Sequence, residues 1–306
     1  MKNKFSNLFS NLFSKKEAVN ALSNSEENMY KEDKQTTDSG MQTAEPESVC
    51  VKKDKFHRLE IRPDGYCFTS TRRYSPIHSP MKKETVEKVF DFAYAMSYGG
   101  KGEHRGHRSG GTHIRKNKEI FIDAFQGKLA ECALFNSVYK LPGASEPDFS
   151  VSELGIWDDA DITVSGKAIS VKSTKHFGQL LLLEQKDWDE KGFYIPNEKK
   201  YDYIVLVRIK PSCDEIIKIQ YPQLGNVCDN EKRLKDIICG QIWTYDYAGY
   251  ITYDELKYII AEKYIIPQGA MLNGRRRMDA SNYYVQAGDL NTIDRNGWTI
   301  ETEEEI

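Results

Sequence analysis

The stretch that decides the fold is residues 158–172, which reads Asp-Asp-Ala-Asp-Ile-Thr-Val-Ser-Gly-Lys-Ala-Ile-Ser-Val-Lys. Its alternation of apolar and polar residues predicts two short strands, and Ser165-Gly166 is a turn signal between them. With a two-residue loop, the strands form an antiparallel hairpin in which Asp161 faces Ser170. The sequence therefore predicts a β-hairpin here.

Side chains alternate between the two faces of a strand, so the predicted hairpin has one apolar and one polar face. The apolar face carries Ile162, Val164, Ile169 and Val171. The polar face carries Asp159, Asp161, Ser170 and Lys172. Such a polar face is either a solvated sheet surface with cross-strand ion pairs or a site that carries chemistry.

A helix is predicted over about residues 119–139, upstream of the hairpin, and it contains Glu131. The residues at helical spacing from Glu131 are mostly apolar, so its carboxylate projects from an apolar stripe. Burying an unpaired charge costs several kcal/mol, so this glutamate needs a lysine, a metal ion or a hydrogen-bond network as its partner. The polar face of the hairpin is a candidate source of that partner.

A helix acid, a strand acid and a lysine are the groups that metal-dependent phosphodiester hydrolysis uses. Carboxylate oxygens are ligands for Mg²⁺, which keeps several waters and accepts phosphate oxygens, and Mn²⁺ is a chemically similar substitute. A nearby lysine orients the attacking water or neutralises developing charge. The predicted cofactor is therefore Mg²⁺.

The series Glu131, Asp161, Ser170-Val-Lys172 resembles the PD-(D/E)XK nuclease superfamily over about residues 119–210. The resemblance implies an α/β (mixed α+β) fold with a restriction-endonuclease-like core, a central mixed sheet flanked by helices. It implies that Glu131, Asp161, Ser170 and Lys172 occupy the catalytic positions. The metal ligands it implies are Glu131, Asp161, Asp159 and the main-chain carbonyl of Val171.

The departure from the family pattern is Ser170, because the family more often has Asp or Glu at this position. Serine supplies no anionic ligand, so two interpretations stay open. One is a Mg²⁺-dependent endonuclease that cuts DNA in restriction or anti-invader defence. The alternative is a catalytically inactive, nuclease-like module that binds nucleic acid or protein.

Basic residues gather in residues 101–118, which contain six Lys or Arg, three His and one Glu. Arginine donates paired hydrogen bonds to phosphate and to guanine edges. The predicted nucleic-acid contacts are Arg105, His107, Arg108, Arg115 and Lys116, together with Arg275, Arg276 and Arg277 beyond an Asn-Gly turn. The alternative is a solvated loop and a surface arginine run that serve solubility.

Other patterns outline the rest of a domain over residues 55–306. A hairpin is expected over 56–71, a helix from Ser79-Pro80 to Gly99-Gly100, and a helix after the capping box at Thr252. Further strands are expected at 203–210, 215–221 and 241–245. The buried stripe of the first helix is expected to be Val86, Val89, Phe90, Ala93 and Ser97.

The first part of the chain, residues 1–54, is predicted to be a disordered tail because residues 21–48 contain almost no large apolar residues. Residues 5–13 repeat Phe-Ser-Asn-Leu at helical spacing and form a short amphipathic segment. No apolar run approaches the roughly 20 residues that cross a bilayer, so no stable membrane insertion is expected. The six cysteines are expected to be reduced in a cytoplasmic protein.

The partners follow from the two interpretations. DNA is the expected partner of the endonuclease, and the inactive module would bind nucleic acid or a protein. Double-strand cutting favours a homodimer. A restriction enzyme would also have a cognate methyltransferase.

Overall fold

The computed structural model describes residues 54–77, 79–101, 110–150 and 160–293. All of them belong to one compact unit, Val49–Ile306. The predicted tail, including residues 5–13, lies outside the described residues except for Asp54. The described chain is a mixed α/β structure, as predicted, with helices interleaved among three sheets.

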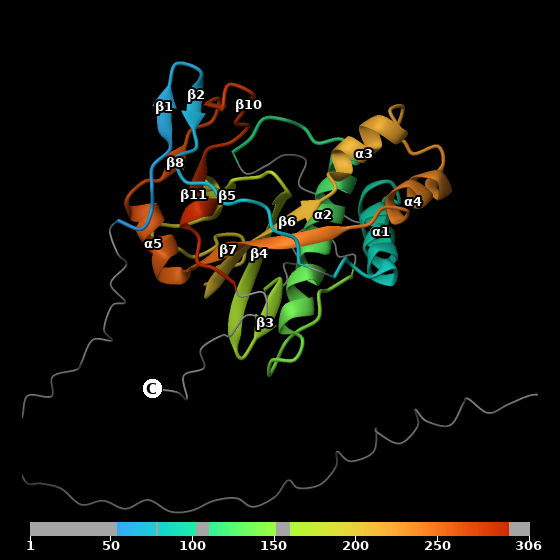
Figure 1. Ribbon diagram of the computed structural model, residues 1–306, viewed down its shortest axis with the longest axis horizontal. Helices are drawn as coiled ribbons and strands as arrows, with labels where there is room; N and C mark the ends of the chain where they lie inside the picture. The colour runs from blue at the N-terminus through green and yellow to red at the C-terminus, as the bar shows by residue number, and fades with distance from the viewer. Residues whose placement is uncertain (1–53, 78, 102–109, 151–159, 294–306) are drawn as a thin grey trace, which may run out of the picture. The chain divides into compact units, whose positions relative to one another are not determined.

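The largest sheet has four strands in the order β3-β4-β6-β7 and crosses the middle of the molecule (Figure 1). They are β3 (Ile162–Val164), β4 (Lys167–Lys175), β6 (Tyr203–Lys210) and β7 (Thr244–Thr252). β3 and β4 are antiparallel, β4 and β6 are parallel, and β6 and β7 are antiparallel. The central sheet is therefore mixed, as the sequence predicted.

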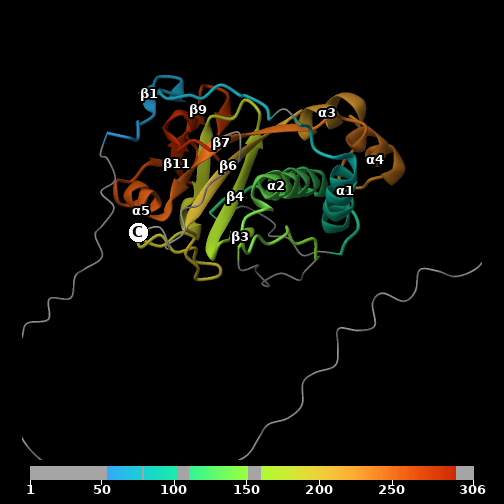
Figure 2. The same ribbon diagram turned by 60° about the horizontal axis from the view of Figure 1, so that its bottom comes forward.

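Helices cover one face of this sheet (Figure 2). They are α1 (Lys83–Ser97), α2 (Asn117–Val138), α3 (Cys213–Gln220) and α4 (Glu231–Cys239). Their buried residues form one core with Ile169 of β4 and Val207 of β6. α2 packs directly on β4, which places the predicted acidic helix against the predicted hairpin.

The other face packs against a second core. This core contains β5 (Leu180–Glu184), β11 (Asn282–Gln286), β8 (Ile265–Ile266) and α5 (Tyr253–Ala261). A smaller sheet is formed by β1 (Glu60–Arg62), β2 (Gly65–Cys67), β9 (Met271–Leu272) and β10 (Arg276–Arg277). Short 3-10 helices follow β5 and β11, at Gln185–Asp187 and Ala287–Asp289. No described helix is long and apolar enough to cross a bilayer.

Several local predictions are confirmed. All five residues of the α1 stripe are buried, and β6 has the predicted bounds. Thr252 caps α5 and Glu255 completes the capping box. The first hairpin forms between β1 and β2 and turns at Pro63-Asp64, although its strands are shorter than predicted.

The strand predicted at 215–221 is wrong, because this segment is mostly helix α3. Buried positions in it follow the helical spacing of Cys213, Ile216 and Ile217, while Ile219 is exposed. Asp214 in the first turn favours the helix electrostatically and pairs with Lys218 one turn later. The alternating isoleucine pattern had favoured a strand.

Two element boundaries also differ from the predictions. α1 begins at Lys83 instead of Ser79-Pro80, because the main-chain amide of Met81 bonds to the carbonyl of Trp243 and holds this segment extended beside β7. β7 begins near the predicted position but continues to Thr252, well beyond 245. Gly249 had obscured the length of this strand, since glycine weakens a strand pattern.

Candidate active site

The β3–β4 hairpin has the predicted register. Val164 pairs with Lys167 and Ile162 pairs with Ile169. The two turn residues, Ser165 and Gly166, have φ angles of 49° and 75°. Positive φ at both positions is typical of a tight type I′ turn, which matches the right-handed twist of the flanking strands. This turn fixes which residues of β4 lie beside Asp161.

Asp161 lies where β3 separates from β4. Its Oδ2 accepts a hydrogen bond from the main-chain amide of Val171 at 2.6 Å and one from the Ser170 hydroxyl at 3.2 Å. The β3 ladder ends one residue later, at Ile162. The aspartate side chain therefore occupies the place of a further strand residue and lies at the edge of β4.

The structure thus brings Asp161 together with Ser170 and Val171. Both hydrogen bonds end on Oδ2, so Oδ1 accepts none from the described residues. The amide and carbonyl of one strand residue point toward the same neighbouring strand. Because the Val171 amide points to Asp161, its carbonyl also faces this edge.

Lys172 projects from the face of β4 opposite α2. Val171 packs with the core of α2, whereas the neighbouring Ala168 packs with the other core, and side chains alternate along a strand. The ammonium of Lys172 lies 6.0 Å from the ring centroid of Tyr194. Ser170, on the same face, is 2% exposed. Lys172 is half-buried, with its charge close to an aromatic ring.

Glu131 lies on α2 and has the partner that its burial requires. Lys128 donates to Glu131 Oε2 at 2.6 Å, and the two side chains are 10% and 15% exposed. The Lys128 ammonium also lies 5.0 Å from the centroid of the Phe92 ring. Burial, followed by the charge of Glu131, raises the pKa of the adjacent Cys132 thiol to about 12.

The described hydrogen bonds and ion pairs leave Glu131 on α2 and Asp161 on the hairpin as two separate groups. Asp159, the other predicted ligand, lies outside the described residues. Among the described residues, no group of three His, Cys, Asp or Glu is arranged to hold a metal ion. Asp161 Oδ1 and the Val171 carbonyl both belong to this edge of β4, and both are hard oxygen ligands of the kind that Mg²⁺ accepts together with waters.

The predicted basic segments meet at a second place, beside the small sheet. Arg105, His107 and Arg108 lie outside the described residues. The main-chain amides of Thr112 and His113 donate to Asp279, which follows β10 two residues after its last arginine. The structure therefore places residues 110–113 next to Asp279, two residues after Arg277, whereas the end of the segment is held by bonds from Asn117 to Asn226 between α3 and α4.

These basic residues differ in how they are compensated. Arg115 pairs with Asp123 at 3.3 Å, and His113 pairs with Glu119 at 2.9 Å. Lys116 and the three arginines 275–277 are exposed. The surface therefore keeps an excess of positive charge.

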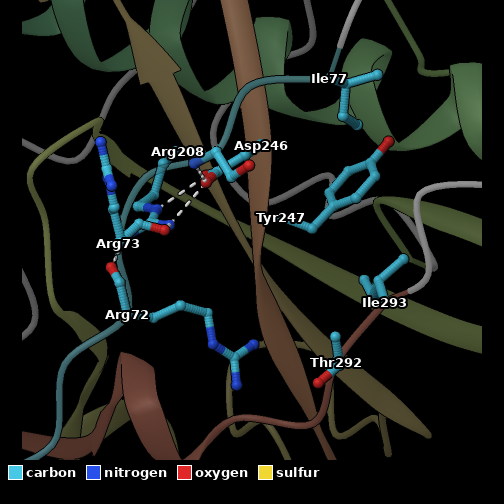
Figure 3. A pocket seen from close by; sticks show the side chains of 9 residues that line it. Arg72, Arg73, Ile77, Arg208, Asp246, Tyr247, Thr292 and Ile293 are labelled. Atoms are coloured by element: carbon cyan, nitrogen blue, oxygen red, sulfur yellow. Dashed lines mark hydrogen bonds and ion pairs between the residues drawn. The ribbon is translucent and has the colours of Figure 1, made fainter.

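The sequence patterns did not point to the buried ion pair of Arg208 and Asp246, on β6 and β7. Arg208 donates through Nε to Oδ1 at 2.8 Å and through Nη2 to Oδ2 at 2.6 Å. The pair forms one wall of a cavity of about 490 Å³ that Arg72 and Tyr247 also line (Figure 3). Burial, followed by the charge of Arg208, lowers the pKa of Arg72. A lone arginine in an otherwise apolar strand was the available signal.

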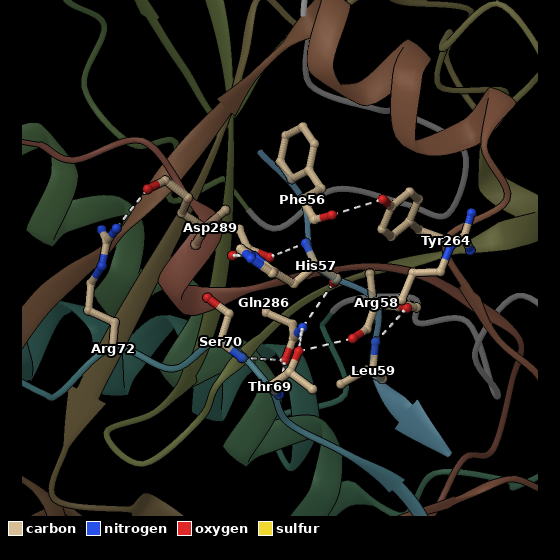
Figure 4. A network of polar contacts seen from close by, with 12 residues as sticks. Phe56, His57, Arg58, Leu59, Thr69, Ser70, Arg72, Tyr264, Gln286 and Asp289 are labelled. Carbon is tan, nitrogen blue, oxygen red and sulfur yellow. Dashed lines mark hydrogen bonds and ion pairs between the residues drawn. The ribbon is translucent and has the colours of Figure 1, made fainter. Parts of the chain in front are cut away.

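A polar network, also missed, fixes the first hairpin to the end of the domain (Figure 4). Gln286 accepts through Oε1 from the main-chain amides of Thr69 and Ser70, and donates through Nε2 to the carbonyl of His57. His57 in turn bonds to Asp289 through its amide and its ring. Each of these contacts joins residues more than 200 positions apart, so they anchor the segment that leads to Arg72.

Comparison of the chain with protein-family models, with curated proteins and with solved structures finds no match to any of them.

Proposed function

We propose that the chain is a Mg²⁺-dependent endonuclease that hydrolyses phosphodiester bonds of DNA, in restriction or other anti-invader defence. The supporting observation is the position of Asp161 at the edge of β4, where Val171 and Ser170 hold its Oδ2 and its Oδ1 accepts no hydrogen bond from the described residues. In this proposal Asp161 Oδ1 and the Val171 carbonyl hold Mg²⁺ together with Glu131 and Asp159, and Mn²⁺ substitutes for Mg²⁺. A homodimer and a cognate methyltransferase belong to the same proposal.

A bound Mg²⁺ would supply charge stabilisation at phosphorus and a water of lowered pKa. The chain's own residues supply the positioning. Val171 and Ser170 fix the carboxylate of Asp161 by two hydrogen bonds, so its free oxygen has a defined direction. Ser170 thereby orients the acid instead of acting as an anionic ligand. Lys172 lies next along β4, and its flexible stem carries the ammonium that orients water or balances charge.

Plasmid cleavage measured against Mg²⁺ concentration tests this proposal. Asp161→Asn and Lys172→Ala should each lower the cleavage rate by about 100-fold or more, because one removes a ligand charge and the other the ammonium. The matched controls are Asp254→Asn and Lys257→Ala, the same changes in an exposed ion pair on α5. Variants at Asp161 and Lys172 that cut as fast as these controls would show that the assignment is wrong.

The second candidate, a module that binds without cutting, is favoured by a specific observation. Both described acids of the predicted site already have protein partners, Asp161 at Val171 and Ser170, and Glu131 at Lys128. Binding of DNA that weakens steeply with salt, with no cleavage at any Mg²⁺ or Mn²⁺ concentration, would identify this module.

A further inference from the structure

The segment that precedes α2 is fastened to the segment that follows β10. Asp279 Oδ1 accepts from the main-chain amides of Thr112 at 3.3 Å and His113 at 3.2 Å. Gln268 donates through Nε2 to the carbonyls of Gly110 at 3.2 Å and Asp279 at 2.8 Å. In Figure 1 the chain before α2 crosses from the small sheet toward α3. Three of these hydrogen bonds fix one segment against the other, and the fourth, from Gln268 to the Asp279 carbonyl, lies within residues 268–279.

A third element meets the same junction. Gly110 has a φ of 80°, and a Cβ added there would lie 3.1 Å from Cδ of Lys186. Glycine thus lets the lysine stem pack against the backbone. Lys186 is exposed, so its apolar stem covers the loop while its ammonium stays in solvent.

The junction gathers positive charge. The cationic residues on the segments that meet there are Lys186, Arg275, Arg276 and Arg277. Lys116 and Lys118 lie farther along the same loop, beside Asn117, which bonds to Asn226 between α3 and α4. In the part of the chain that the structure describes, Lys118, Lys186, Arg275 and Arg276 have no ion-pair partner. Asp279, at the junction itself, accepts two main-chain amides.

We propose that Asp279 is a positioning residue that joins residues 110–118 and 275–277 into one surface for the phosphate backbone of duplex DNA. The inference rests on the proposed function for the identity of the nucleic acid. It adds Lys118 and Lys186 to the expected phosphate contacts, and Asp279 and Gln268 as the residues that position them. Phosphate contacts depend on several cations held at fixed spacing, which two independent loops do not provide.

The length of α2 sets the separation between the end of the basic loop and Glu131. α2 begins at Asn117 and carries Glu131 fourteen residues later, a distance of about 21 Å at 1.5 Å per helical residue. That length corresponds to about six base pairs at 3.4 Å per step. The end of the basic loop and Glu131 are therefore separated by less than one helical turn of duplex DNA.

The test is fluorescence anisotropy of a labelled 30-base-pair duplex in EDTA, so that nothing is cut. Simple electrostatics predicts that removal of a negative charge from a basic surface tightens binding. If Asp279 holds the two segments together, Asp279→Ala should instead bind the duplex about 5-fold more weakly. The slope of log K against log salt should also become shallower by about 1 to 2, because one or two phosphate contacts are lost. Asp279→Asn keeps an oxygen acceptor and loses the charge, so it should bind as tightly as the parent or tighter.

Gln268→Ala provides a second variant that changes no charge. It removes two hydrogen bonds of an exposed side chain, so it should fold and still weaken binding in the same direction. Equal or tighter binding by Asp279→Ala, or unchanged binding by Gln268→Ala, would overturn the inference. The cleavage assay is separate: loss of cutting in Asp161→Asn with DNA binding intact leaves this surface in place. If the parent protein cuts DNA and Asp279→Ala binds DNA as tightly as the parent, the nuclease proposal stands and the inference about Asp279 is overturned.

Discussion

Two aspartates at the main sheet, Asp246 and Asp161, differ in how completely their oxygens are used. Asp246 receives Arg208 on both oxygens and also the main-chain amide of Ser75 at 2.7 Å. Its side chain is 5% exposed and that of Arg208 is 1% exposed. Asp161 uses one oxygen for two hydrogen bonds, and Lys172 is not bonded to it.

The difference separates a structural pair from a candidate site. A buried carboxylate whose two oxygens both accept hydrogen bonds has no oxygen left to bind a ligand. Replacing such a carboxylate leaves its partner cation buried and unpaired. A carboxylate at a sheet edge with one oxygen directed away from its partners retains a ligand position. The number of satisfied oxygens and the burial therefore distinguish the two aspartates better than residue type does.

The largest expected effect comes from removing one member of the buried ion pair of Arg208 and Asp246. Asp246→Ala should lower the free energy of unfolding by about 3–5 kcal/mol, because Arg208 then remains charged and unpaired in the core. Urea denaturation measures this loss. Asp161→Ala, whose hydrogen bonds lie at an edge, should cost about 1–2 kcal/mol. Equal losses for the two variants would remove the distinction.

A double variant sharpens the first result. Replacing both members, with Arg208→Met and Asp246→Leu, should recover much of the loss, since apolar residues of similar volume often substitute for a buried pair. Recovery should be incomplete, because Arg208 also donates to the carbonyls of Arg72 at 2.6 Å and Arg73 at 3.0 Å. The double-mutant cycle isolates the coupling between the two side chains.

The next prediction concerns metal binding by Asp161. If Asp161 holds Mg²⁺ with a dissociation constant of about 1 mM, about 10 mM Mg²⁺ should raise the free energy of unfolding by about 1.4 kcal/mol. Asp161→Asn should abolish this increase, while Asp246→Ala, although less stable, should retain it. Thermal denaturation with and without Mg²⁺ gives both values, and the same increase in Asp161→Asn would place any metal elsewhere.

The sequence contained enough to predict the features that depend on neighbouring residues. The register of β3 and β4 followed from a two-residue turn, and the buried stripe of α1 followed from helical spacing. α3 was missed because Ile217 and Ile219 alternate as in a strand, while its burial pattern depends on which side of the main sheet it packs.

Contacts between distant segments had no local signal. Arg208 and Asp246 lie 38 residues apart, and Asp279 lies more than 160 residues from the loop that it fastens. The bond from Asp161 to Val171 depends on where the β3 ladder ends, which the alternation pattern does not specify. The polar face of the hairpin could thus be predicted from the sequence. Which oxygens of Asp161 accept hydrogen bonds could not.

The ion pair of Arg208 and Asp246 also has a titratable neighbour, His176, which follows the last residue of β4. Its Nδ1 is buried without a hydrogen-bond partner in the described chain. Its ring meets that of Tyr74 at 5.7 Å between centroids, and the Arg208 guanidinium lies 5.6 Å from the same Tyr74 ring. Burial, followed by the charge of Lys210, lowers the pKa of His176 below 6.5.

The smallest expected effect follows from this lowered pKa. Above pH 6.5 the folded and unfolded states both keep His176 neutral, so it contributes nothing to the pH dependence. As the pH falls through 6.5, the unfolded state binds the proton first, and stability declines until the folded-state pKa is passed. His176→Gln should therefore lose less stability than the parent between pH 7 and pH 5, measured as the shift of the urea midpoint. An equal shift in both proteins would show that the core around the Arg208 pair does not disfavour the charged imidazole.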